Sequence, residues 1–136
     1  MSNSIALITG GSRGLGKSTA LKLAEQGVDV VLTYRSNTGE AAKVVAEIEQ
    51  MGRRAVALPL DVGDSKSFRD FAAVLKRTLA QTWQREQFDH LINNAGVGVH
   101  ASFAETTEAQ FDELVNVHFK GTFFLTQALL LSLIHI

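Results

Sequence analysis

The chain lacks cysteine, has one proline, one tryptophan and one tyrosine, and carries almost no net charge. Without cysteine it can form no disulfide and offers no thiolate to a metal. The lack of disulfides is typical of cytoplasmic proteins. Its 13 basic and 14 acidic residues give no reason to expect nucleic acid or a membrane as a partner. No basic segment followed by an apolar core marks the N-terminus as an export signal. We therefore expect a cytoplasmic enzyme.

What the chain does have is a regular alternation of apolar runs and helical patterns. Its 136 residues, 46% of them hydrophobic, suffice for one domain with a buried core. The apolar runs predict strands at residues 5–9, 28–34, 55–60 and 88–93, and the helical patterns predict helices at 14–26, 40–51, around 68–79 and 107–131. This alternation predicts an α/β fold with a parallel sheet. Pro59 cannot donate a ladder hydrogen bond, so the third strand is predicted to lie at a sheet edge.

Residues 5–18, IALITGGSRGLGKS, predict a phosphate-binding turn between the first strand and the first helix. Glycines there let backbone N–H groups approach a phosphate, and the helix N-terminus favours negative charge. Gly10, Gly14 and Gly16 follow a T-G-x-x-x-G-x-G spacing. Residues 11–18 also match G-x-x-x-x-G-K-[ST], the P-loop of nucleoside triphosphatases. The turn alone leaves a dinucleotide-binding fold and a P-loop hydrolase open.

Motifs further along the chain favour the dinucleotide-binding interpretation. Asp61 could hold Mg²⁺ in a P-loop hydrolase, but that fold has no role for residues 93–96 or for Asn116. The chain contains TGGSRGLG at 9–16, Asp-Val at 61–62, NNAG at 93–96, and Asn-Val at 116–117 followed by Gly121. Together, in this order, they resemble the short-chain dehydrogenase/reductase family. The resemblance extends to about Leu131. It implies a Rossmann-type parallel sheet with helices on both faces, truncated after about four strands, in the order 3-2-1-4.

The resemblance also implies roles for individual residues. Arg13 and the backbone of Leu15 would lie along the cofactor phosphates, and Asp61 would recognise the adenine edge. Asn116 resembles the family's active-site asparagine, which kinks its helix and helps hold a water in the proton relay. Lys17 would be a solvated helix residue. The complete set of implied cofactor contacts is Gly10, Ser12, Arg13, Gly14, Leu15, Gly16, Tyr34, Arg35, Ser36, Asp61, Val62, Asn93, Ala95 and Gly96.

The residues around the second strand predict NADP rather than NAD as the cofactor. The strand end meets the adenosine ribose, where an acidic residue selects a free 2′-hydroxyl and arginine accommodates a 2′-phosphate. Arg35 occupies this place, Arg13 lies in the glycine turn, and no carboxylate occurs between Val30 and Gly39. The implied activity is hydride transfer between the nicotinamide and the carbonyl or alcohol carbon of a small substrate.

The catalytic serine, tyrosine and lysine that the resemblance implies cannot be found. Tyr34 is the only tyrosine, and Thr38 rather than lysine follows it four residues later. We therefore expect residues 1–131 to be the dinucleotide-binding half of a longer, homo-oligomeric enzyme and this chain alone to be inactive. Residues 132–136, SLIHI, are predicted to be a non-native tail. A nucleotide-binding module without catalysis and a P-loop nucleotide hydrolase remain the alternatives.

Three further features carry no predicted chemistry. The four histidines show no metal-ligand spacing, so we predict no metal site and assign none of them a role. Trp83 is expected to pack in the core. The segment TWQREQ, residues 82–87, is a long connection into the fourth strand, and the sequence suggests no function for it.

Overall fold

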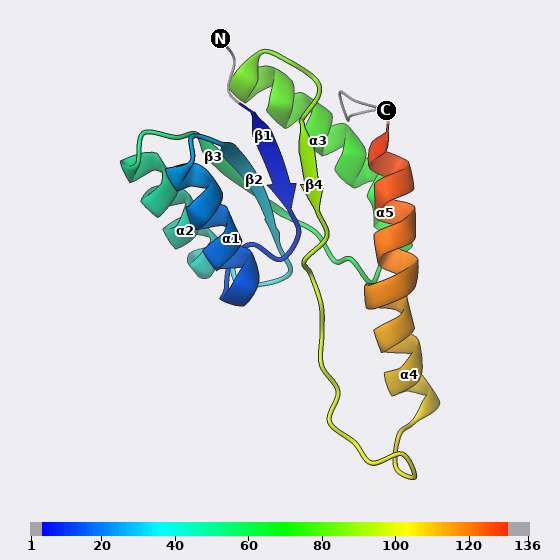
Figure 1. Ribbon diagram of the computed structural model, residues 1–136. Coiled ribbons are helices and arrows are strands. Elements are labelled where there is room, and N and C mark those ends of the chain that lie inside the picture. Colours follow the sequence, from blue (N-terminus) through cyan, green and yellow to red (C-terminus); the bar gives the residue numbers. More distant parts are fainter. Residues whose placement is uncertain (1–3, 131–136) are drawn as a thin grey trace.

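The computed structural model describes residues 4–130 (Figure 1). The predicted alternation of strands and helices is confirmed, and the predicted non-native tail, residues 132–136, lies outside the described residues. The elements are β1 (Ile5–Ile8), α1 (Gly14–Glu25), β2 (Asp29–Tyr34), α2 (Thr38–Gln50), β3 (Ala55–Pro59), a 3₁₀ turn (Ser65–Ser67), α3 (Phe68–Trp83), β4 (His90–Ile92), α4 (Glu108–Val115), a π-helical segment (Asn116–Gly121) and α5 (Thr122–Leu129). None of these helices is long and apolar enough to cross a membrane.

The four strands form one parallel sheet in the order β3-β2-β1-β4. The order predicted from the sequence is confirmed. Ile8 of β1 lies in register with Leu32 of β2 on one side and Ile92 of β4 on the other. Pro59 ends β3 at the edge of the sheet, opposite Tyr34, where its missing N–H costs no ladder bond to a further strand.

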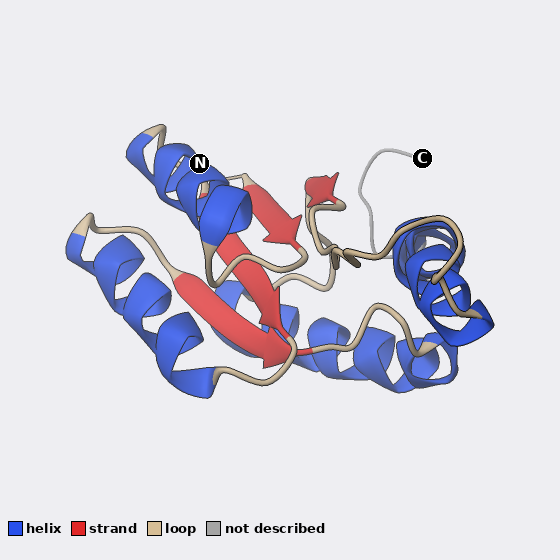
Figure 2. Cartoon of the chain, turned by 90° about the horizontal axis from the view of Figure 1, so that it is seen from below, coloured by secondary structure: helices blue, strands red, loops and turns tan. Residues whose placement is uncertain are grey.

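Helices cover both faces of this sheet (Figure 2). Helices α1 and α2 pack on one face, where small residues such as Ala20 and Ala41 allow close approach to Ile8 and Leu32. Helices α3 and α5 pack on the other face, around the fully buried Phe88. The covered positions of β1 and β2 are mostly apolar, as is usual in a parallel sheet, and the buried polar exceptions are Asp29 and Thr33 of β2. The fold thus leaves the carboxyl ends of the strands as its open edge.

The predicted helix 107–131 is divided into three parts. Thr107 and Gln110 form a capping box at the start of α4. The chain then passes through the π-helical segment into α5. Gly121 lets this helix pack on the loop after β3, because a Cβ there would collide with the carbonyl oxygen of Val62. Leu125 and Leu129 are buried.

The segment 82–87 and two aspartates form a clamp at the amino ends of the strands. Trp83 donates from Nε1 to Asp29 Oδ2 at 2.8 Å, and the Arg54 backbone N–H donates to Asp29 Oδ1 at 3.0 Å. Arg85 donates to Asp89 Oδ1 at 3.1 Å, while Asp89 Oδ2 accepts from the Ile5 N–H at 2.8 Å. The segment for which the sequence suggested no function therefore ties α3 to three strands, on the side away from the carboxyl ends.

Candidate functional site

A cleft of about 520 Å³ opens at the carboxyl ends of the strands. In a parallel α/β sheet this edge is the usual place for ligands. The loops after all four strands contribute to it. It is lined by Gly10, Ser12, Arg13, Gly14, Leu15, Thr33, Tyr34, Arg35, Ser36, Asn37, Leu60, Asp61, Val62, Asn94, Ala95, Gly96, Val97 and Val117.

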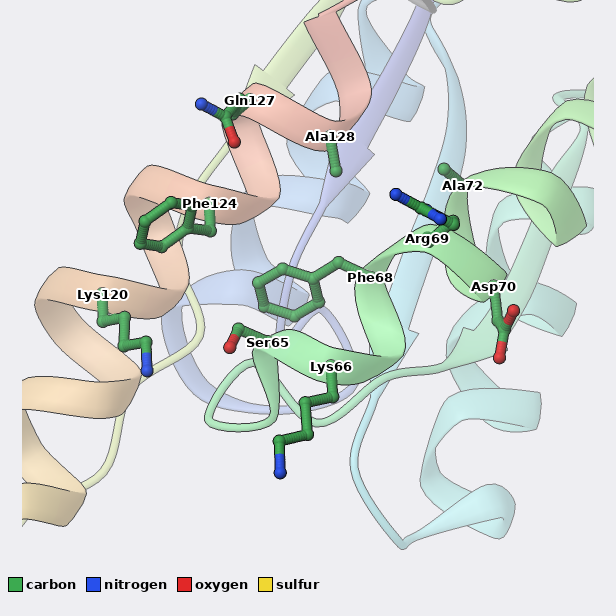
Figure 3. A pocket seen from close by; sticks show the side chains of 10 residues that line it. All are labelled: Ser65, Lys66, Phe68, Arg69, Asp70, Ala72, Lys120, Phe124, Gln127 and Ala128. Atoms are coloured by element: carbon green, nitrogen blue, oxygen red, sulfur yellow. The ribbon is translucent and has the colours of Figure 1, made fainter.

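Most of the residues that the sequence singled out meet in this cleft. They come from four separate motifs: the glycine turn, the end of β2, the Asp61-Val62 pair and the loop after β4. Gly16, Asn93 and Asn116 are not among the lining residues. A larger hollow of about 730 Å³ lies between α3 and α5, where Phe68 and Phe124 occupy facing sides (Figure 3). None of the predicted site residues lines it, so we place the site in the cleft.

The glycines of the turn allow a close approach that other residues would prevent. Gly10 has a φ of +65°, and a Cβ there would lie 3.0 Å from Ala95 Cα. A Cβ on Gly16 would collide with the Gly10 carbonyl and with the side-chain amide of Asn94. Gly16 therefore affects the cleft without lining it, because it lets α1 pack directly on the glycine turn.

The N-terminus of α1 offers unused hydrogen-bond donors to the cleft. Its N-cap residue, Arg13, is extended and makes no side-chain cap, and its first turn contains no acidic residue. By contrast, Asn37 caps α2 by accepting from the Glu40 N–H at 3.0 Å. Free N–H groups and the helix dipole make such an end suitable for a phosphate. The arrangement fits the pyrophosphate of a dinucleotide.

Three polar residues that the sequence analysis did not assign hold the loops of the cleft together. Thr9 Oγ1 accepts from the N–H groups of Asn94 and Ala95 at 3.0 and 2.9 Å. Asn94 Nδ2 donates to the carbonyls of Thr9 and Gly10, both at 3.1 Å. Thr33 Oγ1 accepts from the Gly10 N–H at 3.1 Å. Each residue lies at or just beyond the end of a strand, and that position was the signal available in the sequence.

The two charged residues predicted to contact the adenosine end lie next to each other. Arg35 Nε is 3.9 Å from Asp61 Oδ2, and the two side chains are 62% and 45% exposed. Such an exposed pair contributes about 0–1 kcal/mol. The contact is weak enough to leave the guanidinium available for a phosphate.

Asn93, Asn116 and His118 show how the loop after β4 meets the last helices. Asn93 turns away from the cleft, with Nδ2 3.3 Å from Thr126 Oγ1. Asn116 begins the π-helical segment, and the structure shows no side-chain hydrogen bond from it to residues 4–130. His118 instead reaches the loop, with Nε2 3.1 Å from Val97 N and 2.7 Å from Val97 O. Sequence reasoning gave His118 no role.

Lys17 does not take the position that a P-loop hydrolase requires. Its ammonium lies 3.8 Å from Glu47 of α2, and Lys17 is not among the lining residues of the cleft. Within residues 4–130, no group of three or more potential ligands is placed to hold a metal ion. The geometry gives the hydrolase interpretation no support.

Comparison with known proteins agrees with the arrangement of the cleft. The family model described as short chain dehydrogenase matches residues 4–135. The chain belongs to this family. It is 33% identical over 123 residues to tetrahydroxynaphthalene reductase PfmaG of Pestalotiopsis fici, covering 90% of this chain and 42% of that protein.

Solved structures of short chain dehydrogenases superpose closely on this chain. A dehydrogenase of this family from Burkholderia cenocepacia in complex with NADP has a TM-score of 0.85 and 35% identity, covering 97% of this chain and 51% of that one. The landomycin C-6 ketoreductase LanV with bound NADP and rabelomycin has a TM-score of 0.92 and 32% identity, with coverage of 97% and 54%. The chain spans about half the length of the curated relatives it matches.

Proposed function

We propose that the intact protein carrying this chain is an NADP-dependent short-chain oxidoreductase. It transfers a hydride between the nicotinamide and the carbonyl or alcohol carbon of a small substrate. The observation that carries the proposal is the meeting of four separate motifs in one cleft, beside an uncapped helix N-terminus. Residues 1–131 form the dinucleotide-binding half of this enzyme, and the catalytic serine, tyrosine and lysine belong to its remainder.

The fit of the residues to the cofactor follows from the shape and donors of the cleft. The N–H groups at the start of α1 and the Ser12 side chain bind the pyrophosphate, because the turn brings them together without Cβ obstruction. Asp61 and the Val62 backbone bind the adenine. Ala95 and Gly96 line the ribose side. Asn116 takes part in the proton relay, in keeping with its place at the start of the π-helical segment.

The preference for NADP rests on the charges at the adenosine end. Arg13 and Arg35 both line the cleft, and residues 31–38 contribute no carboxylate to it. A charge-assisted hydrogen bond contributes about 1.5–3 kcal/mol, so one such contact to the 2′-phosphate gives tenfold discrimination or more. NADP is also the cofactor bound in the solved relatives from Burkholderia cenocepacia and in LanV.

The test is a titration of the intact protein with NADPH and with NADH, followed by nucleotide fluorescence. We expect the Kd for NADPH to be at least tenfold lower. A carbonyl compound should then be reduced at the expense of NADPH. Equal or tighter binding of NADH would overturn the cofactor assignment, and binding of neither nucleotide would overturn the proposed function.

A further inference from the structure

His118 connects the π-helical segment to the loop that follows β4. Its Nε2 atom lies 3.1 Å from the backbone nitrogen and 2.7 Å from the backbone oxygen of Val97. One ring nitrogen therefore faces both hydrogen-bonding groups of a single residue. A neutral imidazole accepts the Val97 N–H when Nε2 is bare, and it donates to the Val97 carbonyl when Nε2 carries the proton. Either tautomer keeps one bond to Val97.

The loop beyond Ala95 has few other attachments. In the described part of the chain, the Thr9 hydroxyl holds the Ala95 N–H, and the next hydrogen bonds along the loop are those of His118 to Val97. Hydrogen bonds then resume only at Ser102, and these stay within the loop. Among the hydrogen bonds of residues 4–130, those of His118 alone thus connect residues 96–101 to the last helices.

Gly96 is shaped to receive the imidazole ring. A Cβ on Gly96 would lie 2.6 Å from His118 Cε1, closer than real Cβ contacts come. The ring therefore packs against the backbone of Gly96 while its nitrogen bonds the next residue. Gly96 and Val97 both line the cleft, as does Val117, the neighbour of His118 in the π-helical segment. His118 itself does not line the cleft, but it contacts two residues that do.

We propose that His118 is a positioning residue, which holds the backbone of Gly96 and Val97 in the place that lets them bind the cofactor. This is the side chain through which the π-helical segment hydrogen-bonds the loop after β4, whereas the resemblance gave Asn116 a part in the proton relay. The contact itself is independent of the enzyme's activity. The effect on the cofactor rests on the proposed function.

The first test measures amide hydrogen exchange in the intact protein, in the peptide that contains Val97. His118→Leu removes the acceptor, so we expect faster exchange at Val97. His118→Gln places an amide at about the reach of Nε2, with both a donor and an acceptor, and should restore slow exchange. Asn116→Ala should leave the exchange unchanged. Unchanged exchange in His118→Leu, or acceleration by Asn116→Ala alone, would overturn the proposal.

The second test measures NADPH binding by the same variants. Loss of one hydrogen bond that orders the cleft wall should raise the Kd about tenfold in His118→Leu. His118→Gln should stay within about twofold of the parent, a rescue that a purely space-filling role would not produce. His100→Ala, which changes an exposed histidine of the same loop, is the matched control.

A further variant, Gly96→Ala, tests the same contact in case His118→Leu misfolds. The added Cβ would collide with the His118 ring and displace it from Val97, so exchange at Val97 should accelerate although His118 is intact. If the parent protein and His118→Leu bind NADPH equally well, this inference is overturned and the proposed function is not. Parent protein that binds no nicotinamide nucleotide would overturn the proposed function, and with it the cofactor part of the inference.

Discussion

At the scale of single residues, two kinds of residue form the cleft: an arginine with a charged side chain, and glycines that have no side chain. Arg35 follows β2, lines the cleft and is held only weakly by Asp61. The glycines of the turn contribute backbone alone. This division matches a ligand with a phosphate at one end that needs charge and a diphosphate that needs N–H groups. Two substitutions test the two kinds of wall separately.

Arg35→Ala should lower the preference for NADPH over NADH about tenfold or more, since it removes a charge-assisted contact to the 2′-phosphate. Binding of NADH should change little. The measurement is the ratio of the two dissociation constants in the intact protein. Arg77→Ala, which removes an exposed arginine of α3, controls for net charge. A preference that survives Arg35→Ala would show that another group reads the phosphate.

Gly16→Ala should abolish cofactor binding, although Gly16 does not line the cleft. The added Cβ collides with the Gly10 carbonyl, which belongs to the rigid turn, and with the Asn94 amide. Helix α1 must then move away from the turn, and its N-terminal N–H groups no longer point toward the phosphates of the cofactor. Gly98→Ala is the matched control, because a Cβ at Gly98 meets no atom within 4 Å. Native-like affinity in Gly16→Ala would contradict this packing argument.

At the scale of elements, the amino ends of the strands form a rigid base for the loops at the carboxyl ends. Burial would raise the pKa of Asp89, but hydrogen bonds from Arg85 and the Ile5 N–H, with the charge of Arg85, outweigh it and leave the pKa below its ordinary value of 3.8. The folded state therefore favours the ionised carboxylate. Its stabilising contribution is present above the unfolded pKa and is lost as the pH falls through the lowered folded pKa.

Asp89→Asn should consequently lower the free energy of unfolding at pH 7 by about 1.5–3 kcal/mol, the range for hydrogen bonds to a charged group. The difference between the two proteins should shrink as the pH is lowered below about 4, where the parent loses its carboxylate as well. Urea denaturation at neutral and acid pH measures both. Asp112→Asn, an exposed change on α4, should show neither effect. A difference that grows on acidification would reverse the sign of the argument.

At the scale of the whole molecule, the described residues leave two surfaces that need a partner. Strand β4 pairs only with β1 among residues 4–130, so its other edge carries unpaired backbone groups. The helices α4 and α5 and the π-helical segment between them also present a run of exposed apolar side chains, namely Phe111, Val115, Phe119, Phe123 and Phe124. Open edges and apolar surfaces of this kind promote association.

We therefore expect residues 1–136, expressed alone, to self-associate and to reduce no carbonyl compound. Without the tyrosine and lysine there is no proton donor, and general acid catalysis alone contributes about 10²–10⁴-fold to the rate. Sedimentation velocity and an NADPH consumption assay measure the two parts of this prediction. A monodisperse, cooperatively melting monomer that turns over NADPH would contradict it.

Much of the fold could be predicted because its signals are local. Buried strands, helix periodicity, the capping box at Thr107 and the edge position of Pro59 each depend on neighbouring residues and on backbone chemistry. The glycine turn could be predicted as well, since few structures other than a phosphate site need glycines at that spacing. The direction of side chains at the ends of strands could not be predicted. Asn93 and Asn94 are adjacent and chemically identical, yet one faces α5 and the other holds the turn.

The sequence by itself determined the strand order, the family and the residues that gather at the carboxyl ends of the sheet. Only the tertiary structure decided that His118 bonds the loop after β4, that Lys17 pairs with Glu47 of α2, and that segment 82–87 clamps the amino ends of the strands. The reason is physical. Strand and helix formation depends on periodic burial within a short window, whereas these contacts join residues 21, 30 and 54 positions apart, after packing has set the rotation of each helix.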